Sequence, residues 1–232
     1  MSDKYSKNYF IIDTFMFHNE FELLKARMSI LKDVVDVHLL VEGNRTFQGA
    51  EKPLYFQESG IKHDRLYHAA VNLPHQATPW QREAAQRIQT LEYLQFMMQV
   101  NGISVVLLSD VDEIPHPDAV LKLRTANSDE IEAGKVVGFH QNCYYYYADL
   151  QTSFRWIGTK AQRIDEVINL QALRDTKTGT NLEPYGWHFS FLGNEEAIRN
   201  KIASYSHSEY NIPDMLDNIN KNVKERQDLF GR

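Results

Sequence analysis

The feature that most constrains this chain is a short apolar run that is followed at once by acidic residues. The run is Ile103–Leu108, and the residues after it read Ser-Asp-Val-Asp-Glu-Ile-Pro, ending at Pro115. A run this short and this rich in β-branched residues is typical of a strand buried on both faces in the middle of a parallel α/β sheet. Ligands bind beyond the carboxyl ends of such strands, so the acidic residues are predicted to lie at a binding site.

Two of these acidic residues have the spacing of a metal site. Asp110 and Asp112 are two positions apart, and in an extended chain such side chains point to the same side. Paired carboxylates suit Mn²⁺ or Mg²⁺, whose remaining ligands are commonly water and substrate phosphate. In the alternative interpretation the carboxylates form a turn and cap the helix that Pro115 and Pro117 announce. The position after a buried strand favours an Asp-x-Asp metal and diphosphate site.

Strands and helices alternate along the first half of the chain. A capping box of Asn19 and Glu22 and the sequence Thr78-Pro79 predict the starts of two helices. This alternation predicts an α/β fold with a mostly parallel central sheet and right-handed crossovers. The predicted strands are 9–12, 35–41, 66–71 and 103–108.

The second half of the chain has a different pattern, with long aromatic segments that predict a partly antiparallel arrangement. Its predicted strands are 136–147, 154–157 and 187–192. We expect one domain over residues 1–232, because 43% hydrophobic content supports a single large core. The domain is predicted to divide into a first half at about 9–116, a second half at about 117–213 and a polar, marginally ordered tail over 214–232.

The helix predicted from Thr78 to Asn101 carries both an apolar stripe and two arginines. Arg82 and Arg87 are candidates for binding a diphosphate, because a guanidinium group can bind two phosphate oxygens at once. The alternative is a solvated face on which Glu83 forms ordinary ion pairs. The residues expected to face the core are Trp80, Ala84, Ile88, Leu91 and Met98.

Composition excludes several other kinds of partner. The net charge of −6 argues against nucleic acid, because phosphate backbones select basic faces. Cys143 is the single cysteine, so an intrachain disulfide is impossible and a reducing compartment, the cytoplasm, is expected. The first eight residues contain no apolar signal core, and no stretch reaches the roughly 18 apolar residues of a membrane span.

Several segments of the chain resemble one known family. Taken together they are similar to glycosyltransferase family 17, and their order along residues 10 to 210 makes the resemblance far more specific than one Asp-x-Asp. The segments are Ile12–Glu20, Val41–Gly49 with Lys52–Leu54, Ser109–Pro115, Gly186–Ser190 and Ser206–Tyr210.

This resemblance implies a fold, a donor and a metal. The family implies a GT-A-type nucleotide-diphospho-sugar transferase fold, a UDP-N-acetylglucosamine donor, a glycan acceptor, Mn²⁺ or Mg²⁺, and inversion at the anomeric carbon. It makes 9–116 the donor half of the domain and 117–213 the acceptor half. His188 is implied as a third metal ligand, because His188–Gly193 resembles the histidine-and-glycine segment that closes the metal site in other GT-A enzymes. His207 is the second choice. The alternative is that His188 is a hydrogen-bonded core histidine.

The resemblance also suggests residues that bind the donor. Arg87 resembles a donor-binding arginine of GT-A folds, and Glu42 and Asn44 are placed near the uracil or ribose by the resemblance alone. Lys201 is a candidate for neutralising the diphosphate, with an ordinary solvated lysine as the alternative. The polar segment 174–181 has the composition of a mobile loop over the donor, or of a plain surface turn.

Inversion requires a general base near the acceptor, normally a carboxylate. The candidates are Glu113, Glu195 and Asp149, and the sequence does not separate them. Tyr144–Tyr147 with Trp156 would form an aromatic platform for an acceptor sugar, or alternate between core and surface.

Two other classes of function fit parts of the pattern. A phosphoesterase or sugar-phosphate hydrolase would need two metals, and the residues available to hold them are Asp110, Asp112, Glu113 and His188. Such sites usually recruit more histidines and carboxylates than these. An inactive sugar-binding module would not need an Asp-x-Asp pair. The sequence therefore favours a metal-dependent inverting glycosyltransferase.

Overall fold

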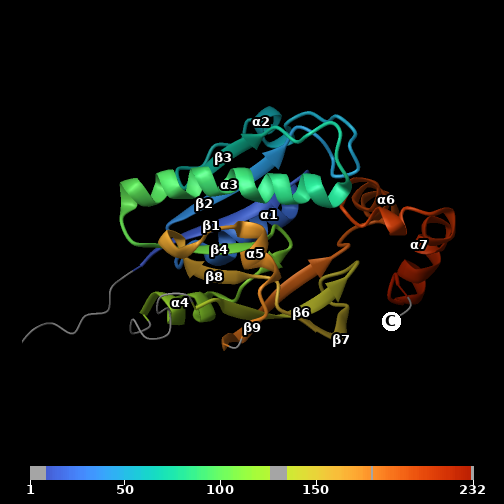
Figure 1. The fold of residues 1–232 in the computed structure, drawn as a ribbon. Helices are drawn as coiled ribbons and strands as arrows, with labels where there is room; N and C mark the ends of the chain where they lie inside the picture. The colour runs from blue at the N-terminus through green and yellow to red at the C-terminus, as the bar shows by residue number, and fades with distance from the viewer. Residues whose placement is uncertain (1–8, 126–134, 179, 231–232) are drawn as a thin grey trace, which may run out of the picture.

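The computed structural model describes residues 9–125, 135–178 and 180–230, and their strands join into one nine-stranded sheet (Figure 1). The strands are β1 (Phe10–Phe17), β2 (Val37–Gly43), β3 (Leu66–Val71), β4 (Ser104–Asp110), β5 (Glu113–Ile114), β6 (Val137–Tyr145), β7 (Gln151–Trp156), β8 (Lys160–Arg163) and β9 (Thr180–Ser190). The helices are α1 (Phe21–Leu31), α2 (Tyr55–Ser59), α3 (Pro79–Asn101), α4 (Pro117–Thr125), α5 (Leu170–Asp175), α6 (Glu195–Ser204) and α7 (Pro213–Glu225).

The sheet is parallel in its first half and mixed in its second. Its order is β3-β2-β1-β4-β8-β6-β9-β5, with β7 beside β6. The first four strands run parallel, with Ile12 of β1 opposite Val37 of β2 and Val106 of β4. In the second half β8 is antiparallel to β4 and β6, while β9 is parallel to β6. The prediction of an α/β fold with a mostly parallel sheet and a partly antiparallel second half is confirmed.

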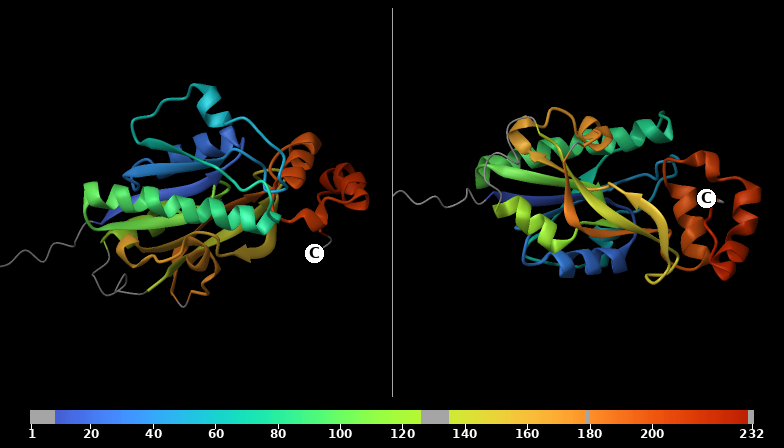
Figure 2. Two further views of the ribbon diagram at one scale, coloured as in Figure 1. Left: turned by 45° about the horizontal axis from the view of Figure 1, so that its top comes forward. Right: turned by 90° about the horizontal axis from the view of Figure 1, so that it is seen from below.

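Helices cover both faces of the sheet, as the two further views show (Figure 2). Along β4, Val105 and Leu107 belong to the core cluster that contains residues of α4, while Val106 and Leu108 belong to the cluster that contains residues of α3 and α5. Alternation along a strand sends side chains to opposite faces, so a strand covered on both faces is apolar throughout. The apolar run of β4 is explained by this double burial.

The long helix α3 begins as expected but presents a different face to the protein. Thr78 and Gln81 form a capping box, and Pro79 opens the helix. The predicted core stripe is wrong at Trp80 and Ile88, which are 49% and 52% exposed. The buried residues of α3 are instead mostly polar: Arg82, Gln86, Arg87, Thr90 and Leu94. Arg82 bonds carbonyls in the loops that follow β2 and β3, and Gln86 bonds the carbonyl of Val41 in β2. These contacts explain why polar residues of α3 are buried.

Two further local predictions differ from the structure. The N-cap of α1 is Glu20 without a side-chain cap, so the predicted Asn19 capping box does not form; Glu20 instead accepts hydrogen bonds from the amides of His18 and Asn19. The expected polar tail contains α7, whose Ile219 is fully buried against α6. Within the described residues, no helix combines the length and apolarity needed to cross a membrane.

Candidate active site

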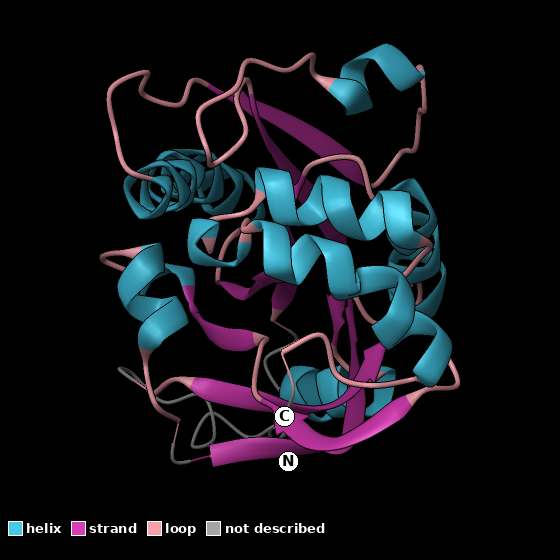
Figure 3. Cartoon of the chain, turned by 90° about the vertical axis from the view of Figure 1, so that its right-hand side faces the viewer, coloured by secondary structure: helices cyan, strands magenta, loops and turns pink. Residues whose placement is uncertain are grey.

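A cavity of about 540 Å³ lies at the carboxyl ends of the parallel strands. Figure 3 views the molecule from this end, where α6 and α7 stand in front of the sheet. Residues from β1, β2, β4, β9 and α6 line the cavity together, and a volume of this size is typical of small-molecule sites. Its acidic lining residues are Glu20, Glu83, Asp110, Asp112, Glu113 and Asp175.

Asp110 and Asp112 both line the cavity, but they bind different side chains. Asp110 ends β4 and Val111 and Asp112 form a turn, so the pair is not in the extended geometry assumed from the sequence. Asp110 accepts Arg174 Nη2 at 3.0 Å and faces Arg87 at 3.4 Å. The partners of Asp112 come from elsewhere in the chain and are described next.

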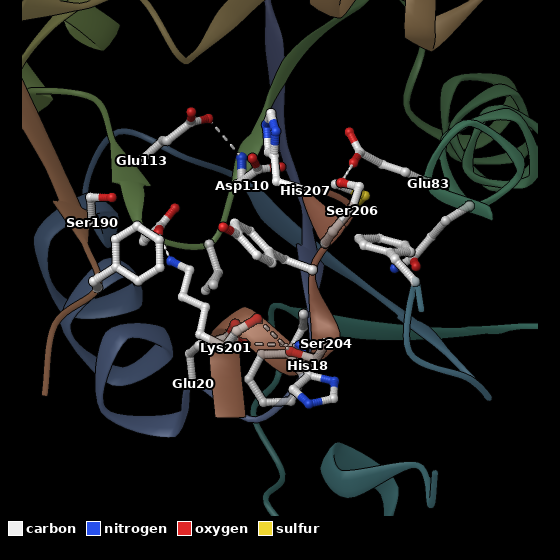
Figure 4. Close-up of a pocket in the computed structure, with 18 of the residues that line it drawn as sticks. His18, Glu20, Glu83, Asp110, Glu113, Ser190, Lys201, Ser204, Ser206 and His207 are labelled. Atoms are coloured by element: carbon white, nitrogen blue, oxygen red, sulfur yellow. Dashed lines mark hydrogen bonds and ion pairs between the residues drawn. The ribbon is translucent and has the colours of Figure 1, made fainter. Parts of the chain in front are cut away.

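Lys201 and His188 both face the same oxygen of Asp112, at different distances. Lys201 Nζ lies 2.6 Å from Asp112 Oδ2, and His188 Nε2 lies 4.0 Å from the same oxygen. Burial alone would lower the pKa of Lys201, but the neighbouring Asp112 raises it overall. Lys201 is therefore a charged ammonium. Figure 4 shows its side chain rising from α6 into the pocket.

The donor atoms of this corner fit a divalent ion in part. In the described residues, no group of three His, Cys, Asp or Glu side chains is gathered closely enough to hold a metal. Asp112 Oδ2 and His188 Nε2 are 4.0 Å apart, which is within twice a metal–oxygen distance of about 2.1 Å. Ions such as Mg²⁺ are commonly held by one or two carboxylates plus water and substrate phosphate. The pair therefore fits an ion whose shell is completed by a ligand.

Glu113, which also lines the cavity, is held in place by a second cation, Arg174. Arg174 binds it with both terminal nitrogens at 2.6 and 2.7 Å, and Trp156 Nε1 donates to it at 2.5 Å. Burial alone would raise the pKa of Glu113, but Arg174 lowers it to about 2. A Cβ at Gly158 would lie 2.4 Å from the Glu113 carboxyl carbon, so only glycine fits there. A carboxylate this acidic and this enclosed is a poor proton acceptor.

Beneath the turn that carries Asp112, Arg27 holds the chain from inside. Its side chain is fully buried, and Nη1 donates to the carbonyls of Asp110 and Glu113 at 3.1 and 2.9 Å. Asp13 accepts the other side of the guanidinium at 2.5 and 2.8 Å and also contacts His38 Nδ1 at 2.8 Å. Burial would raise the pKa of Asp13, but Arg27 and His38 lower it to about 2. This network fixes the turn's backbone.

Three of the residues predicted to bind the donor have structural partners and do not line the cavity. Glu42 is fully buried and accepts hydrogen bonds from Lys52 and from the amides of Tyr55 and Phe56. Asn44 accepts from the amide of Leu73 and donates to Asn72. Arg82 donates to the carbonyls of Phe47, Pro74 and His75. These three residues hold the loops whose neighbouring residues line the cavity.

The other predicted site residues are spread more widely. Arg87 is buried behind the wall, bound to Glu83 and to Gln171 at 2.7 Å. Glu195 pairs with Arg199, and Asp149 pairs with Arg226; neither carboxylate lines the cavity. His207 does line it, and its ring lies against Trp80 at 4.6 Å.

The predicted aromatic segment is divided between wall and core. Tyr145 and Trp156 line the cavity, together with Phe154 from β7. Tyr146 is buried, and Tyr144 and Tyr147 do not line the cavity. Phe154 is 46% exposed, so it offers an open aromatic surface at the rim. Aromatic and charged side chains therefore line the cavity together, and Trp156 joins the two kinds through its hydrogen bond to Glu113.

Several cavity residues were not identified from the sequence. Arg174 was assigned to a mobile loop, yet it lies in α5 and binds two carboxylates; Gly179 of the same segment lies outside the described residues. Asp175 follows it on the cavity wall, with Gln171 as a neutral partner at 3.1 Å. Glu20 stands in a segment that carried the family resemblance, and that signal would have identified it.

Comparison with known proteins gives a family and a set of relatives. The model for glycosyltransferase family 17 matches residues 3–231. The beta-1,4-mannosyl-glycoprotein 4-beta-N-acetylglucosaminyltransferases of Rattus norvegicus and Homo sapiens are each 31% identical over 130 residues, covering 49% of this chain. The match covers 23% of the length of those relatives. A solved 4-diphosphocytidyl-2C-methyl-D-erythritol synthase has a TM-score of 0.46 at 10% identity, covering 74% of this chain and 82% of its own, which is too low to assign the fold.

Proposed function

The chain belongs to glycosyltransferase family 17, and on that basis we propose that it moves N-acetylglucosamine from UDP-N-acetylglucosamine to a hydroxyl of a glycan acceptor, with inversion at the anomeric carbon. The relatives named as N-acetylglucosaminyltransferases support this sugar as the donor group. The mixed sheet, with its cavity at the carboxyl ends of parallel strands, supports a GT-A-type fold.

The observation that carries the proposal is the clustering of charges on one side of the cavity. Asp110 and Asp112 stand at the end of β4, and Arg174 and Lys201 bring two cations to them. A sugar nucleotide leaves as a diphosphate, whose negative charge grows during the reaction and must be neutralised there. The same corner therefore offers carboxylates for a metal ion and, in Lys201, a cation for the diphosphate.

The residues of the chain have separate tasks in this mechanism. A bound Mn²⁺ or Mg²⁺ would supply Lewis-acid charge to the leaving diphosphate, held by Asp112 and His188, with Asp110 beside them. Arg174 keeps Asp110 and Glu113 in place through its two-sided contact. Arg27 fixes the backbone of the turn, so that the carboxylates do not move as charge develops.

The acceptor hydroxyl needs a carboxylate to take its proton. Among the described residues, most cavity carboxylates are paired with a cation, but Glu20 and Asp175 have no Lys, Arg or His ion-pair partner. Either can accept a proton without first losing an ion pair. In the proposed mechanism the base is one of these two residues, and the aromatic side formed by Phe154 and Trp156 receives the acceptor sugar.

The test is a donor screen with the purified chain. We expect release of the nucleoside diphosphate to be faster from UDP-N-acetylglucosamine than from UDP-glucose, UDP-galactose or GDP-mannose, and to require Mn²⁺ or Mg²⁺. Asp112→Asn is nearly isosteric and removes a charge, so it should reduce the rate more than tenfold while the melting temperature stays close to that of wild type. NMR of the product linkage reports inversion.

Each outcome of the screen bears on a different part of the proposal. Equal rates with all four donors would contradict the choice of N-acetylglucosamine. Full activity in EDTA would contradict the metal. A retained α-linkage would contradict inversion. Neither binding nor turnover of any nucleotide sugar would overturn the transferase proposal as a whole.

A further inference from the structure

Lys201 is held in place by a well-packed helix. Ile198 and Ile202 of α6 are fully buried, and the helix begins at Asn194, whose side chain accepts from the amide of Ala197. Gln48 of the loop after β2 donates to the carbonyl of Ile202 at 2.7 Å. The backbone of Lys201 therefore has little freedom, and only its side chain can change position.

Within the part of the chain that the structure describes, the ammonium of Lys201 makes one ion pair, with Asp112. Nζ lies 2.6 Å from Asp112 Oδ2 and 5.2 Å from the centre of the Phe191 ring. Its side chain is 28% exposed and lines the cavity, whereas that of Asp112 is only 7% exposed. An enclosed carboxylate needs a positive partner, and in the described residues Lys201 is the one amine or guanidinium that Asp112 has.

Arg174 provides the contrast within the same site. It binds Glu113 with two nitrogens and Asp110 with one of them, at 2.6 to 3.0 Å, and it also donates to the carbonyl of Gly158. Moving it would break four hydrogen bonds at once. A lysine with a single ionic contact on a flexible stem can be exchanged at much lower cost.

The oxygen that Lys201 occupies is also the one nearest to His188. Asp112 Oδ2 lies 2.6 Å from Lys201 Nζ and 4.0 Å from His188 Nε2. A divalent ion held by the carboxylate and the imidazole would therefore compete with the ammonium for this oxygen. Like charges at such short range repel strongly in an enclosed site. The ammonium and the ion cannot both keep this oxygen without a balancing anion.

We propose that Lys201 is an internal counter-ion of Asp112, which gives up this oxygen when a divalent ion binds and then contacts the diphosphate of the donor. The inference rests on the proposed function, because that function supplies both the ion and the diphosphate. Lys201 neutralises Asp112 before substrate arrives. Afterwards the same charge binds the substrate, without any movement of the helix.

The exchange predicts opposite effects of one substitution on two ligands. In Lys201→Met, Mn²⁺ no longer competes with the ammonium, so its affinity in the absence of nucleotide should rise about fivefold or more. UDP should bind about tenfold more weakly at saturating Mn²⁺, because a charge-assisted hydrogen bond to the diphosphate is missing. Electron paramagnetic resonance of free Mn²⁺ measures the first quantity, and calorimetry measures the second.

Two further variants control for folding and for general charge. Lys201→Gln keeps a hydrogen-bond donor without the charge and should shift both affinities in the same directions by smaller factors, which retains the test if Lys201→Met does not fold. Lys25→Met removes an exposed lysine of α1, paired with Glu22 outside the cavity, and should change neither affinity.

The results separate this inference from its alternatives. Weaker binding of both Mn²⁺ and UDP would make Lys201 a structural residue and overturn the exchange. Unchanged or undetectable Mn²⁺ binding with weaker UDP binding would make it a plain diphosphate contact, which also overturns the exchange. If the opposite shifts appear but no donor is turned over, the exchange stands and the proposed transfer fails.

Discussion

The charged residues beneath the cavity, which we call its floor (Asp13, Arg27 and Glu42), do not line it, whereas those of its wall, such as Lys201 and Asp110, do. On the floor, Asp13, Arg27 and Glu42 are fully buried, and each is bound to other groups of the protein. On the wall, Lys201 is 28% exposed and Asp110 is 36% exposed, and both face open space. Leaving a buried charge unpaired is costly, so the floor residues cannot exchange their protein partners for a ligand. The comparison assigns geometry to the floor and ligand binding to the wall.

Substitution of Arg27, the central cation of the floor, should have the largest effect on stability. Arg27→Met leaves Asp13 buried beside His38 alone and frees the carbonyls of the turn. Breaking a buried pair by removing one partner typically costs about 3–5 kcal/mol. We expect the free energy of unfolding, measured by urea denaturation, to fall by that amount, or the chain not to fold. Lys25→Met on the same helix removes an exposed pair and should cost less than about 1 kcal/mol.

A small loss in Arg27→Met would break the comparison, because it would mean that the floor tolerates an unpaired carboxylate. If the variant folds, its turnover sharpens the assignment. A floor residue positions the turn without touching substrate, so we expect the turnover number to fall further than the affinity for UDP.

The same division explains which parts could be predicted from the sequence. The strands and the site at the end of β4 follow from a local apolar run and its acidic end, so pattern alone indicates them. The residues that contact the acidic end of β4 cannot be identified from a local pattern. Lys201 lies 89 residues from Asp112 in the sequence, and Arg174 lies 61 residues from Glu113. Their contacts depend on how the second half folds back over the sheet.

The polar face of α3 shows a second limit of sequence reasoning. The sequence predicts that Arg82 binds phosphate or lies on a solvated face, and it does not single out Gln86, yet both are buried. Each donates to backbone carbonyls of neighbouring segments, as Gln86 does to Val41 at 2.8 Å. Loops that carry a site need their backbone groups bonded, and long polar side chains serve that need. No periodicity in the helix itself reveals this demand.

The next largest effect on stability is expected on lowering the pH. The pH dependence of the unfolding free energy should differ between a substitution at Glu113 and one at an exposed acidic residue. Because its pKa is lowered from 4.5 to about 2, Glu113 stabilises the fold above pH 4.5, and this contribution is lost as pH falls towards 2. The full difference is on the order of 3 kcal/mol. In Glu113→Gln the unfolding free energy should therefore decline less between pH 5 and pH 2. Denaturant midpoints measured across this range provide the check.

An exposed carboxylate gives the control for that titration. Glu22 has an 84% exposed side chain and pairs only with Lys25, so Glu22→Gln should follow the wild-type curve. A Glu113→Gln curve parallel to wild type would show that Arg174 does not hold this carboxylate more tightly than water does. Glu113 would then behave like an exposed carboxylate, in contrast to what its contacts in the structure indicate.

The smallest effects are expected at two carboxylates that lie outside both regions. Asp149 is 72% exposed and pairs with Arg226, and Glu195 pairs with Arg199 one turn along α6. Exposed pairs contribute at most about 1 kcal/mol, so Asp149→Asn and Glu195→Gln should leave stability nearly unchanged. Because neither side chain lines the cavity, kcat/KM should stay within about twofold of wild type, whereas the base of an inverting transfer contributes about a hundredfold or more. A loss of that size in either variant would place a catalytic carboxylate outside the described cavity, and the division into floor and wall would then need a third, mobile part that closes over the acceptor.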